Sequence, residues 1–356
     1  MAVISELVDL PPADEVTGEG RLTWLAPLRS PKILAGFIIL AVFILAAIIG
    51  PILDTANPSA LSGAALDPPS FAHPLGTTAT GQDVLAQLLE GSRISLWVGF
   101  LSAALATVIG MIVGIIGGYL AGIADEALSL VSNVFLVIPT LPLVIVISGY
   151  LPSKGAVSVA VVIALTGWAW GARVQRAQTL SIRRRDYISA ARATGESLWR
   201  IIVYEILPNE MAIVVAGFLF TVIFAILTQA GLAFLGLSSV SEWSWGTMLY
   251  WAQNNQALQV GAWWWFVPPG LCIALVGTGL SLINFGIDEF INPRLRTGGA
   301  APASGPRRRW RRTAGTAEAG DHDGHLVGQD LVHDDAPEAF AGRPGGEGQP
   351  RGADRD

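Results

Sequence analysis

The segment Asp186–Asn209, DYISAARATGESLWRIIVYEILPN, is polar and lies between two long apolar runs. Arginines are concentrated within it and just before it: Arg173, Arg176, Arg183, Arg184, Arg185, Arg192 and Arg200. Clusters of Lys and Arg beside apolar spans are typical of the cytoplasmic loops of membrane proteins. We therefore interpret this segment as a cytoplasmic loop that docks onto a partner, and not as part of a membrane span.

The composition of the whole chain predicts a membrane protein. Of its 356 residues, 52% are hydrophobic and 14% are charged, and the mean hydropathy is +0.52; soluble domains carry about a quarter charged residues. A helix needs roughly 20 apolar residues to cross the hydrocarbon core. Six stretches qualify, near 33–53, 95–122, 127–150, 155–172, 211–236 and 262–287. We expect an all-α, polytopic membrane protein with six transmembrane helices.

The distribution of basic residues predicts the orientation. The first apolar run begins only after some thirty polar or mixed residues and is long enough to span, so we expect it to be retained and not cleaved as a signal peptide. With the N-terminus inside, only Arg93 and Lys154 of the core's basic residues fall outside. This asymmetry favours a multi-pass protein of the plasma or inner membrane with both termini in the cytoplasm.

Changes of composition divide the chain into four parts. Residues 1–30 are expected to be a cytoplasmic lead-in, and 31–93 the first transmembrane helix with an external segment. Residues 94–296 would form a five-helix core with the docking loop near 183–209. The remainder, 297–356, is rich in Gly, Pro, Ala, Arg and Asp, and we expect a disordered cytoplasmic tail.

Two features of the spans predict how they pack. Small residues recur every four positions in the second span, at Ala106, Gly110, Gly114 and Gly118, so a neighbouring backbone can approach closely. We expect this contact to be within the same subunit, with a subunit interface as the alternative. In the third span, Pro139 and Pro142 remove backbone donors and should kink the helix.

Several classes of chemistry find no support. The six stretches contain no Asp, Glu, Lys, Arg or His, which disfavours a proton relay. Neither Lys32 nor Lys154 follows a glycine, so a phosphate-binding loop is excluded. We predict no catalytic site, no metal site, no cofactor bound by this chain and no nucleic-acid partner. Energy for uphill transport would have to come from another polypeptide.

The docking loop is predicted to form a helix-turn-helix elbow. Asp186 is expected to be the N-cap of a short helix that begins at Tyr187, and Gly195 suits the left-handed conformation that ends it. Three alanines keep this helix slim: Ala190, Ala191 and Ala193. A second helical run contains Leu198, Ile201 and Ile202, and we expect Leu207-Pro208 to stop it.

At these residues the chain resembles the permease subunits of type I ATP-binding-cassette (ABC) importers. Their cytoplasmic signature is Glu-Ala-Ala, three residues, Gly, and a spacer ending in Leu-Pro. Here it reads Ser189-Ala190-Ala191, Gly195 and Leu207-Pro208, with Ser189 in place of the usual acid. The stretch EILPN at Glu205–Asn209 is similar to the dipeptide and oligopeptide branch.

Three further stretches extend the resemblance over about residues 30–296. HPLGTTATGQDVLAQLLEGSRISLWVG, from His73, resembles that branch's external signature, with Gln82 where an Arg is usual. QAGLAFLGLSSVSEWSWGTML begins at Gln229, a position that is commonly acidic, and NPRLR at Asn292–Arg296 is also typical.

The resemblance implies a permease subunit that forms half of a translocation pathway for di- or oligopeptides. It implies as partners a second homologous permease, two cytoplasmic ABC ATPases that bind ATP and Mg, an extracellular or periplasmic solute-binding protein, and membrane lipid. The residues expected to couple to the ATPases are Asp186, Ser189, Ala190, Ala191, Gly195, Leu207 and Pro208. Import of oligosaccharides or chelated nickel by the same architecture, and a self-sufficient channel or secondary carrier, are the alternatives.

Two groups of residues are candidates for the solute path. Thr221, Thr228 and Gln229 lie in the fifth span, which the resemblance places beside the pathway; hydrogen bonding within or between helices is the alternative. A tryptophan-rich stretch contains Trp243, Trp245, Trp251, Trp263, Trp264 and Trp265. We expect these rings to form an interfacial belt, and a stacking surface for solute is the alternative.

Overall fold

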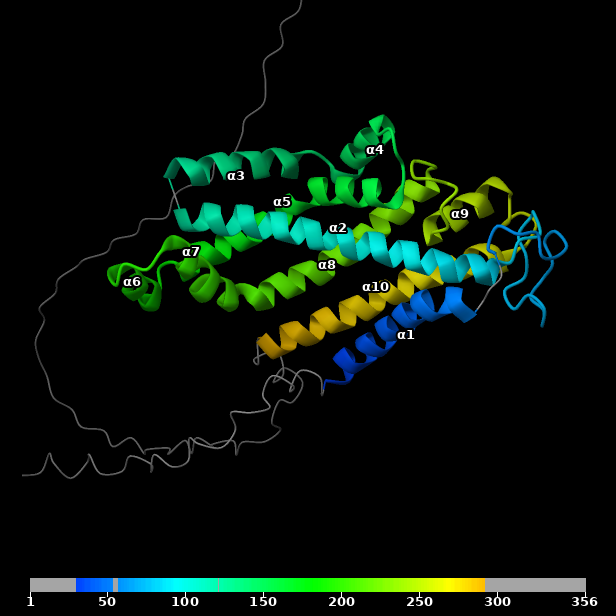
Figure 1. Cartoon of the computed structure of the whole chain (residues 1–356), viewed down its shortest axis with the longest axis horizontal. Coiled ribbons are helices and arrows are strands. Elements are labelled where there is room, and N and C mark those ends of the chain that lie inside the picture. Colours follow the sequence, from blue (N-terminus) through cyan, green and yellow to red (C-terminus); the bar gives the residue numbers. More distant parts are fainter. Residues whose placement is uncertain (1–29, 54–56, 121, 292–356) are drawn as a thin grey trace, which may run out of the picture. The chain divides into compact units, whose positions relative to one another are not determined.

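The computed structural model describes residues 30–53, 57–120 and 122–291, which form a bundle of helices (Figure 1). Five of these helices are long and apolar enough to cross a membrane: α1 (Pro31–Leu53), α2 (Val84–Leu120), α5 (Ala156–Ile182), α8 (Leu207–Phe234) and α10 (Trp263–Ile291). Nearly all of the predicted lead-in, the tail 297–356 and the NPRLR stretch lie outside the described residues.

The third apolar stretch is broken, as its prolines predict. It forms α3 (Gly122–Val137) and α4 (Thr140–Tyr150), whose axes differ by 89°. Pro139 stands at the break, where its missing N–H and its restriction on the preceding residue end α3. Pro142 lies in the first turn of α4, where a proline is tolerated. With the bent pair taken as one span, the count is the predicted six.

The glycine stripe of α2 packs against α5 of the same chain, which confirms the intrasubunit contact. A Cβ added at Gly110 would lie 3.2 Å from the backbone oxygen of Trp168, and one at Gly118 would lie 2.9 Å from that of Arg176. Since residue numbers rise together along this contact, α2 and α5 run in the same direction. The absence of side chains on α2 therefore lets the two backbones meet directly.

Helix α1 lies beside α10 on the other side of the bundle (Figure 1). A Cβ on Gly36 would lie 2.5 Å from the carbonyl oxygen of Gly279, and Lys32 Nζ lies 3.3 Å from Glu289 Oε2. The start of α1 thus adjoins the end of α10. The opposite face of α1 exposes large apolar side chains that suit lipid: Leu34, Ile38, Val42, Leu45, Ile48 and Ile52.

The tryptophans do not form one interfacial belt. Trp245, at the start of α9 (Trp245–Asn254), is completely buried, and its Nε1 donates to Ser92 Oγ at 3.1 Å. Trp265 is also buried, whereas Trp263 is half exposed. A tryptophan ring is large enough to supply core volume as well as interface contact, so the belt interpretation is wrong for the two buried rings.

Candidate functional site

The predicted elbow is present and lies at the end of the bundle opposite α9 (Figure 1). Its first helix is α6 (Asp186–Ala193). Gly195 follows with φ +77°, and its N–H donates to the oxygen of Arg192 at 3.1 Å, while Glu196 N–H donates to that of Ala191 at 3.1 Å. This pair of bonds is a Schellman motif, so the prediction that Gly195 ends the helix in a left-handed conformation is confirmed.

The other boundaries differ from the predictions. Arg185 is the N-cap of α6 and Asp186 is the first helical residue, so the predicted capping role of Asp186 is wrong. Its carboxylate still lies in the first turn, where a negative charge favours the helix dipole. Leu207-Pro208 does not stop a helix but begins α8, because a proline's missing N–H costs nothing in a first turn.

Between α6 and α8 the chain winds through α7 (Leu198–Arg200) and a π-helical segment, η3 (Ile201–Ile206). The N–H of Leu207 donates to the oxygen of Ile202, five residues back. Pro208 supplies no N–H to an α-helical bond at this junction, which favours the wider turn. The elbow therefore connects to α8 without a loop.

Isoleucines attach the elbow to the membrane helices. Ile188 of α6 is completely buried, and it belongs to an apolar cluster with Ile115 of α2, Ile182 of α5 and the η3 residues Ile201 and Ile206. Burying side chains of this size contributes about 1.5–3 kcal/mol each. These contacts hold α6 against the ends of α2 and α5 and against the segment that leads into α8.

Polar contacts attach the same elements. Arg183 Nη1 donates to the oxygens of Gly118 and Tyr119, at 2.9 and 3.4 Å. The guanidinium of Arg192 lies 4.9 Å from the centre of the Tyr119 ring, and its Nε donates to that hydroxyl at 3.2 Å. Two of the loop's arginines therefore hold α5 and α6 against the end of α2, a role that the charge pattern did not reveal.

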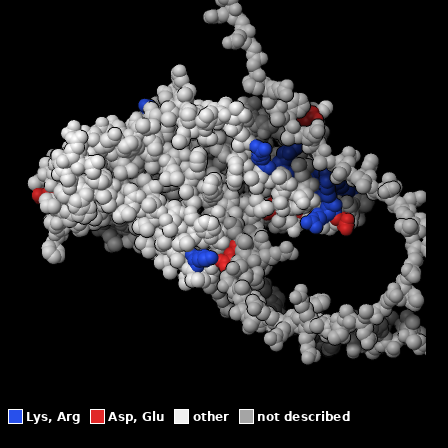
Figure 2. Space-filling view, turned by 180° about the vertical axis from the view of Figure 1, so that it is seen from behind, with Lys and Arg blue, Asp and Glu red and all other residues white. Residues whose placement is uncertain are grey.

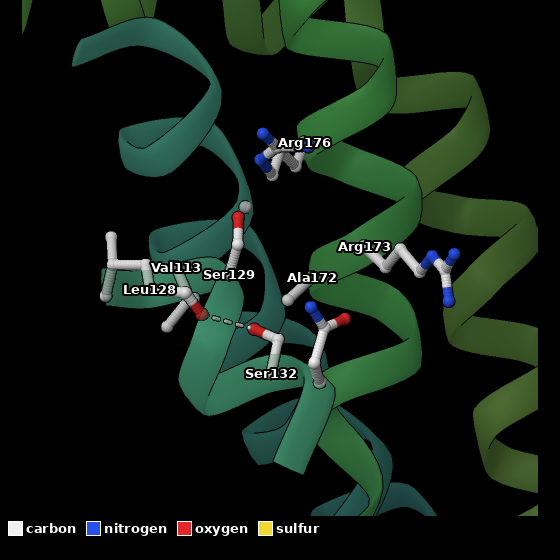
Figure 3. A pocket seen from close by; sticks show the side chains of 9 residues that line it. Val113, Leu128, Ser129, Ser132, Ala172, Arg173 and Arg176 are labelled. Carbon is white, nitrogen blue, oxygen red and sulfur yellow. Dashed lines mark hydrogen bonds between the residues drawn. The ribbon is translucent and has the colours of Figure 1, made fainter. Parts of the chain in front are cut away.

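A cavity of about 290 Å³ lies between α2, α3 and α5 (Figure 3). Arg176 Nη2 pairs with Asp125 Oδ2 at 2.7 Å, and Ser132 Oγ donates to the oxygen of Leu128 at 2.8 Å. Arg173 points away from α3 in this view. Because these polar groups are satisfied by the protein itself, we interpret them as structural. Among the described residues, no cluster of three or more His, Cys, Asp or Glu could hold a metal ion.

The outer face of the elbow exposes the residues with the signature spacing. Ser189, Ala190 and Gly195 are exposed, whereas Ala191 is partly buried against the isoleucine cluster. The structure thus brings Asp186, Ser189, Ala190, Ala191 and Gly195 together on one short helix and its turn, while Leu207 and Pro208 lie beyond η3.

Sequence reasoning missed two exposed aromatic side chains in the segment between α6 and α8. Trp199 is 71% exposed and Tyr204 is 69% exposed, although both are amphipathic and large. Leu198, which the helical spacing grouped with Ile201 and Ile202, is exposed as well. The signal was present in the sequence, because Trp199 stands inside a polar segment. Such residues are enriched where one protein binds another.

Glu210 is a second residue that the sequence reasoning missed. It lies in the first turn of α8, completely buried, and Thr179 Oγ1 of α5 donates to its Oε1 at 2.7 Å. Its other oxygen has no hydrogen-bond partner among the described residues. The carboxylate joins α5 to α8 just inside the elbow, and it escaped notice because it lies one residue before the predicted span.

The three candidate path residues lie farther along α8. Thr221 Oγ1 donates to the oxygen of Gly217 at 2.7 Å, which matches the intrahelical alternative. Thr228 and Gln229 are buried within this chain. Gln229 lies 22 residues after Leu207, about 33 Å along the helix, so the structure does not bring these three residues together with the elbow.

Comparisons with known proteins give consistent results. Residues 93–297 match the model of the family described as "Binding-protein-dependent transport system inner membrane component". The chain is 31% identical over 291 residues to the oligopeptide transport system permease protein OppC of Bacillus subtilis, covering 80% of this chain and 94% of that protein. It is 32% identical over 278 residues to the dipeptide transport system permease protein DppC of the same organism, covering 77% and 85%.

Proposed function

The chain belongs to the family of binding-protein-dependent transport system inner membrane components and is a permease subunit, and we propose that its complex imports di- or oligopeptides. The names of the oligopeptide and dipeptide relatives support this cargo. In this proposal the subunit forms half of the translocation pathway and performs no covalent chemistry. A complex that instead imports oligosaccharides or chelated nickel is the competing hypothesis.

We propose that ATPase subunits dock on the exposed face of α6. The observation that carries this proposal is the elbow, whose outer face is slim and exposed while its inner face is fixed by Ile188 to the isoleucine cluster. Because packed interfaces shift between discrete arrangements and do not deform continuously, a displacement of α6 should be transmitted to the ends of α2, α5 and α8, against which it packs. The exposed Trp199 and Tyr204 supply the large contact surfaces that binding sites favour.

We propose that the α6 end faces the cytoplasm. Figure 2 shows Lys and Arg gathered at this end on the face in view. The described arginines there include Arg183, Arg184 and Arg192, whereas Arg93 and Lys154 belong to the opposite end. An excess of basic residues supports cytoplasmic exposure.

The remaining partners follow from the proposed complex. We propose a second homologous permease, two ABC ATPases that bind ATP and Mg, and a solute-binding protein on the outer side. ATP is assigned to the partners because the sequence contains no phosphate-binding loop. Thr221, Thr228 and Gln229 stay candidates for the solute path, to be tested by the transport of variants at these positions.

Replacement of Gly195 by valine tests the coupling role. A valine at φ +77° is strained by about 1–2 kcal/mol, and its side chain projects into open space, since no atom lies within 4 Å of an added Cβ. We expect Gly195→Val to insert normally and to lose most peptide uptake while the ATPases of the purified complex continue to hydrolyse ATP.

Gly122 provides a matched control. It has φ +66° and also has no atom within 4 Å of an added Cβ, but it lies at the start of α3, outside the elbow. Gly122→Val should therefore carry similar strain and keep its uptake. Undiminished uptake by Gly195→Val, or equal losses in both variants, would contradict the coupling role.

The cargo is tested by adding excess oligosaccharide or nickel chelate to the uptake assay with labelled peptide. Inhibition by either competitor would favour that competing hypothesis.

A further inference from the structure

A cavity of about 640 Å³ lies where the elbow meets the ends of α2 and α5. It is lined by Tyr119 and Leu120 at the end of α2, by Arg183 and Arg184 just after α5, and by Ser189 and Arg192 of α6. Of its lining residues, only Ser189 is also among the residues expected to couple to the ATPases. Its walls therefore come from the end of α2, from the segment after α5 and from α6.

The cavity has a concentrated positive charge. Three of its six lining residues are arginines and none is acidic. Two carboxylates of the same region are engaged by other arginines, because Asp125 pairs with Arg176 and Glu196 pairs with Arg200. Asp186, in the first turn of α6, is not among the lining residues. Within the described part of the chain, none of the three lining arginines forms an ion pair with a carboxylate.

Two of the three guanidinium groups are held in position by contacts other than ion pairs. Arg183 donates to backbone oxygens of α2, and Arg192 rests on the ring and hydroxyl of Tyr119. Side chains fixed in this way lose little further conformational entropy when they bind a ligand. Guanidinium groups also match the geometry of phosphate oxygens and donate two hydrogen bonds at once.

The location of the cavity favours a lipid headgroup over a soluble anion as the phosphate-bearing ligand. The cavity opens at the ends of two membrane-crossing helices, and Leu120 on its wall is 45% exposed, so apolar surface adjoins the arginines. This combination suits a lipid, whose acyl chains remain in the membrane while its headgroup enters the cavity. Basic pockets between transmembrane helices at the cytoplasmic face bind anionic headgroups in this way.

We propose that the cavity binds the phosphate of an anionic phospholipid from the cytoplasmic leaflet. The bound headgroup joins Arg184, which follows α5, to Arg192 of α6, and it thereby braces the elbow against the membrane helices. The location of the site in this leaflet rests on the proposed orientation. The binding itself requires no ATPase and no solute, so its test is independent of the transport assay.

Native mass spectrometry of the purified full-length chain tests the proposal. The chain is titrated with phosphatidylglycerol, which is anionic, or with phosphatidylcholine, which is zwitterionic. We expect tight binding of one phosphatidylglycerol and weaker binding of phosphatidylcholine. Because each arginine near an anionic surface strengthens binding, Arg184→Gln together with Arg192→Gln should weaken the phosphatidylglycerol adduct by roughly tenfold or more.

Two controls separate charge from structure. Arg200→Gln removes an exposed arginine at the same end that already pairs with Glu196, and it should leave lipid binding unchanged. Tyr119→Phe removes the hydroxyl partner of Arg192 but keeps the ring and the charge, so it should weaken binding less than the double variant. Equal binding of the two lipids, or an unchanged adduct in the double variant, would overturn the proposal. Displacement of the lipid by millimolar inorganic phosphate would instead assign the site to a soluble anion.

Discussion

Replacement of Gly114 by alanine measures how closely α2 and α5 pack. The added Cβ would lie 2.5 Å from the carbonyl oxygen of Ala172, 2.7 Å from the Cβ of Gln175 and 3.1 Å from the backbone nitrogen of Arg176. Two of these atoms belong to the α5 backbone and cannot rotate away. The helices must therefore separate along the contact, and overpacking of this kind costs about 1–3 kcal/mol.

The higher helix propensity of alanine stabilises the variant and so offsets part of this overpacking cost. Alanine is favoured over glycine in a helix by about 1 kcal/mol. Gly117 of the same helix isolates this contribution, because a Cβ there would meet its nearest neighbour, Asp125 Oδ1, at an ordinary 3.5 Å. We expect Gly117→Ala to be neutral or slightly stabilising, and Gly114→Ala to be less stable than Gly117→Ala by about 1–3 kcal/mol.

Reversible unfolding of the purified chain by SDS in mixed micelles gives both free energies of unfolding. The comparison uses two single-methyl additions on one helix, so differences in insertion and in detergent binding largely cancel. Equal stability of the two variants would refute the direct backbone contact between α2 and α5. A Gly114→Ala protein more stable than Gly117→Ala would refute it more strongly.

Two further perturbations have distinct expected results. Asp125→Asn removes the charge that pairs with the half-buried Arg176. It should lower the free energy of unfolding by about 1–3 kcal/mol, measured by the same SDS titration. The same loss in an Arg176→Gln background would show that the ion pair is not its cause. Trp245→Ala empties a completely buried position and should cost about 3–5 kcal/mol, whereas Trp263→Ala, at a half-exposed ring, should cost less than about 1 kcal/mol. Similar losses from the two tryptophan variants would contradict their different burial.

The span pattern was predictable because one physical requirement dominates it. A helix in lipid needs about twenty apolar residues with internally satisfied backbone groups, so apolar length located the spans. It did not reveal that α2 begins at Val84, that α5 continues to Ile182, or that α9 forms. The break at Pro139 and the left-handed Gly195 were also predictable, because each depends on the local stereochemistry of one residue.

Features that depend on tertiary contacts were not predictable. Proline both ends helices and begins them, so Leu207-Pro208 fitted a stop as well as the start that the structure has. The ring of Trp245 suits an interface or a core, and only its neighbours decide between them. At the candidate site, the spacing gave the elbow and its exposed alanines, but the exposed Trp199 and the buried Glu210 depend on how η3 and α8 wind.

The bent pair of α3 and α4 has a consequence for how the chain is threaded through the bilayer. Since α2 and α5 point the same way, the segment between them has to return the chain to the side from which α2 started. A re-entrant excursion cannot do this, so the pair counts as one full passage. The described helices then make an even number of passages, so the start of α1 and the end of α10 lie on the same side of the bundle, in agreement with the 3.3 Å between Lys32 Nζ and Glu289 Oε2.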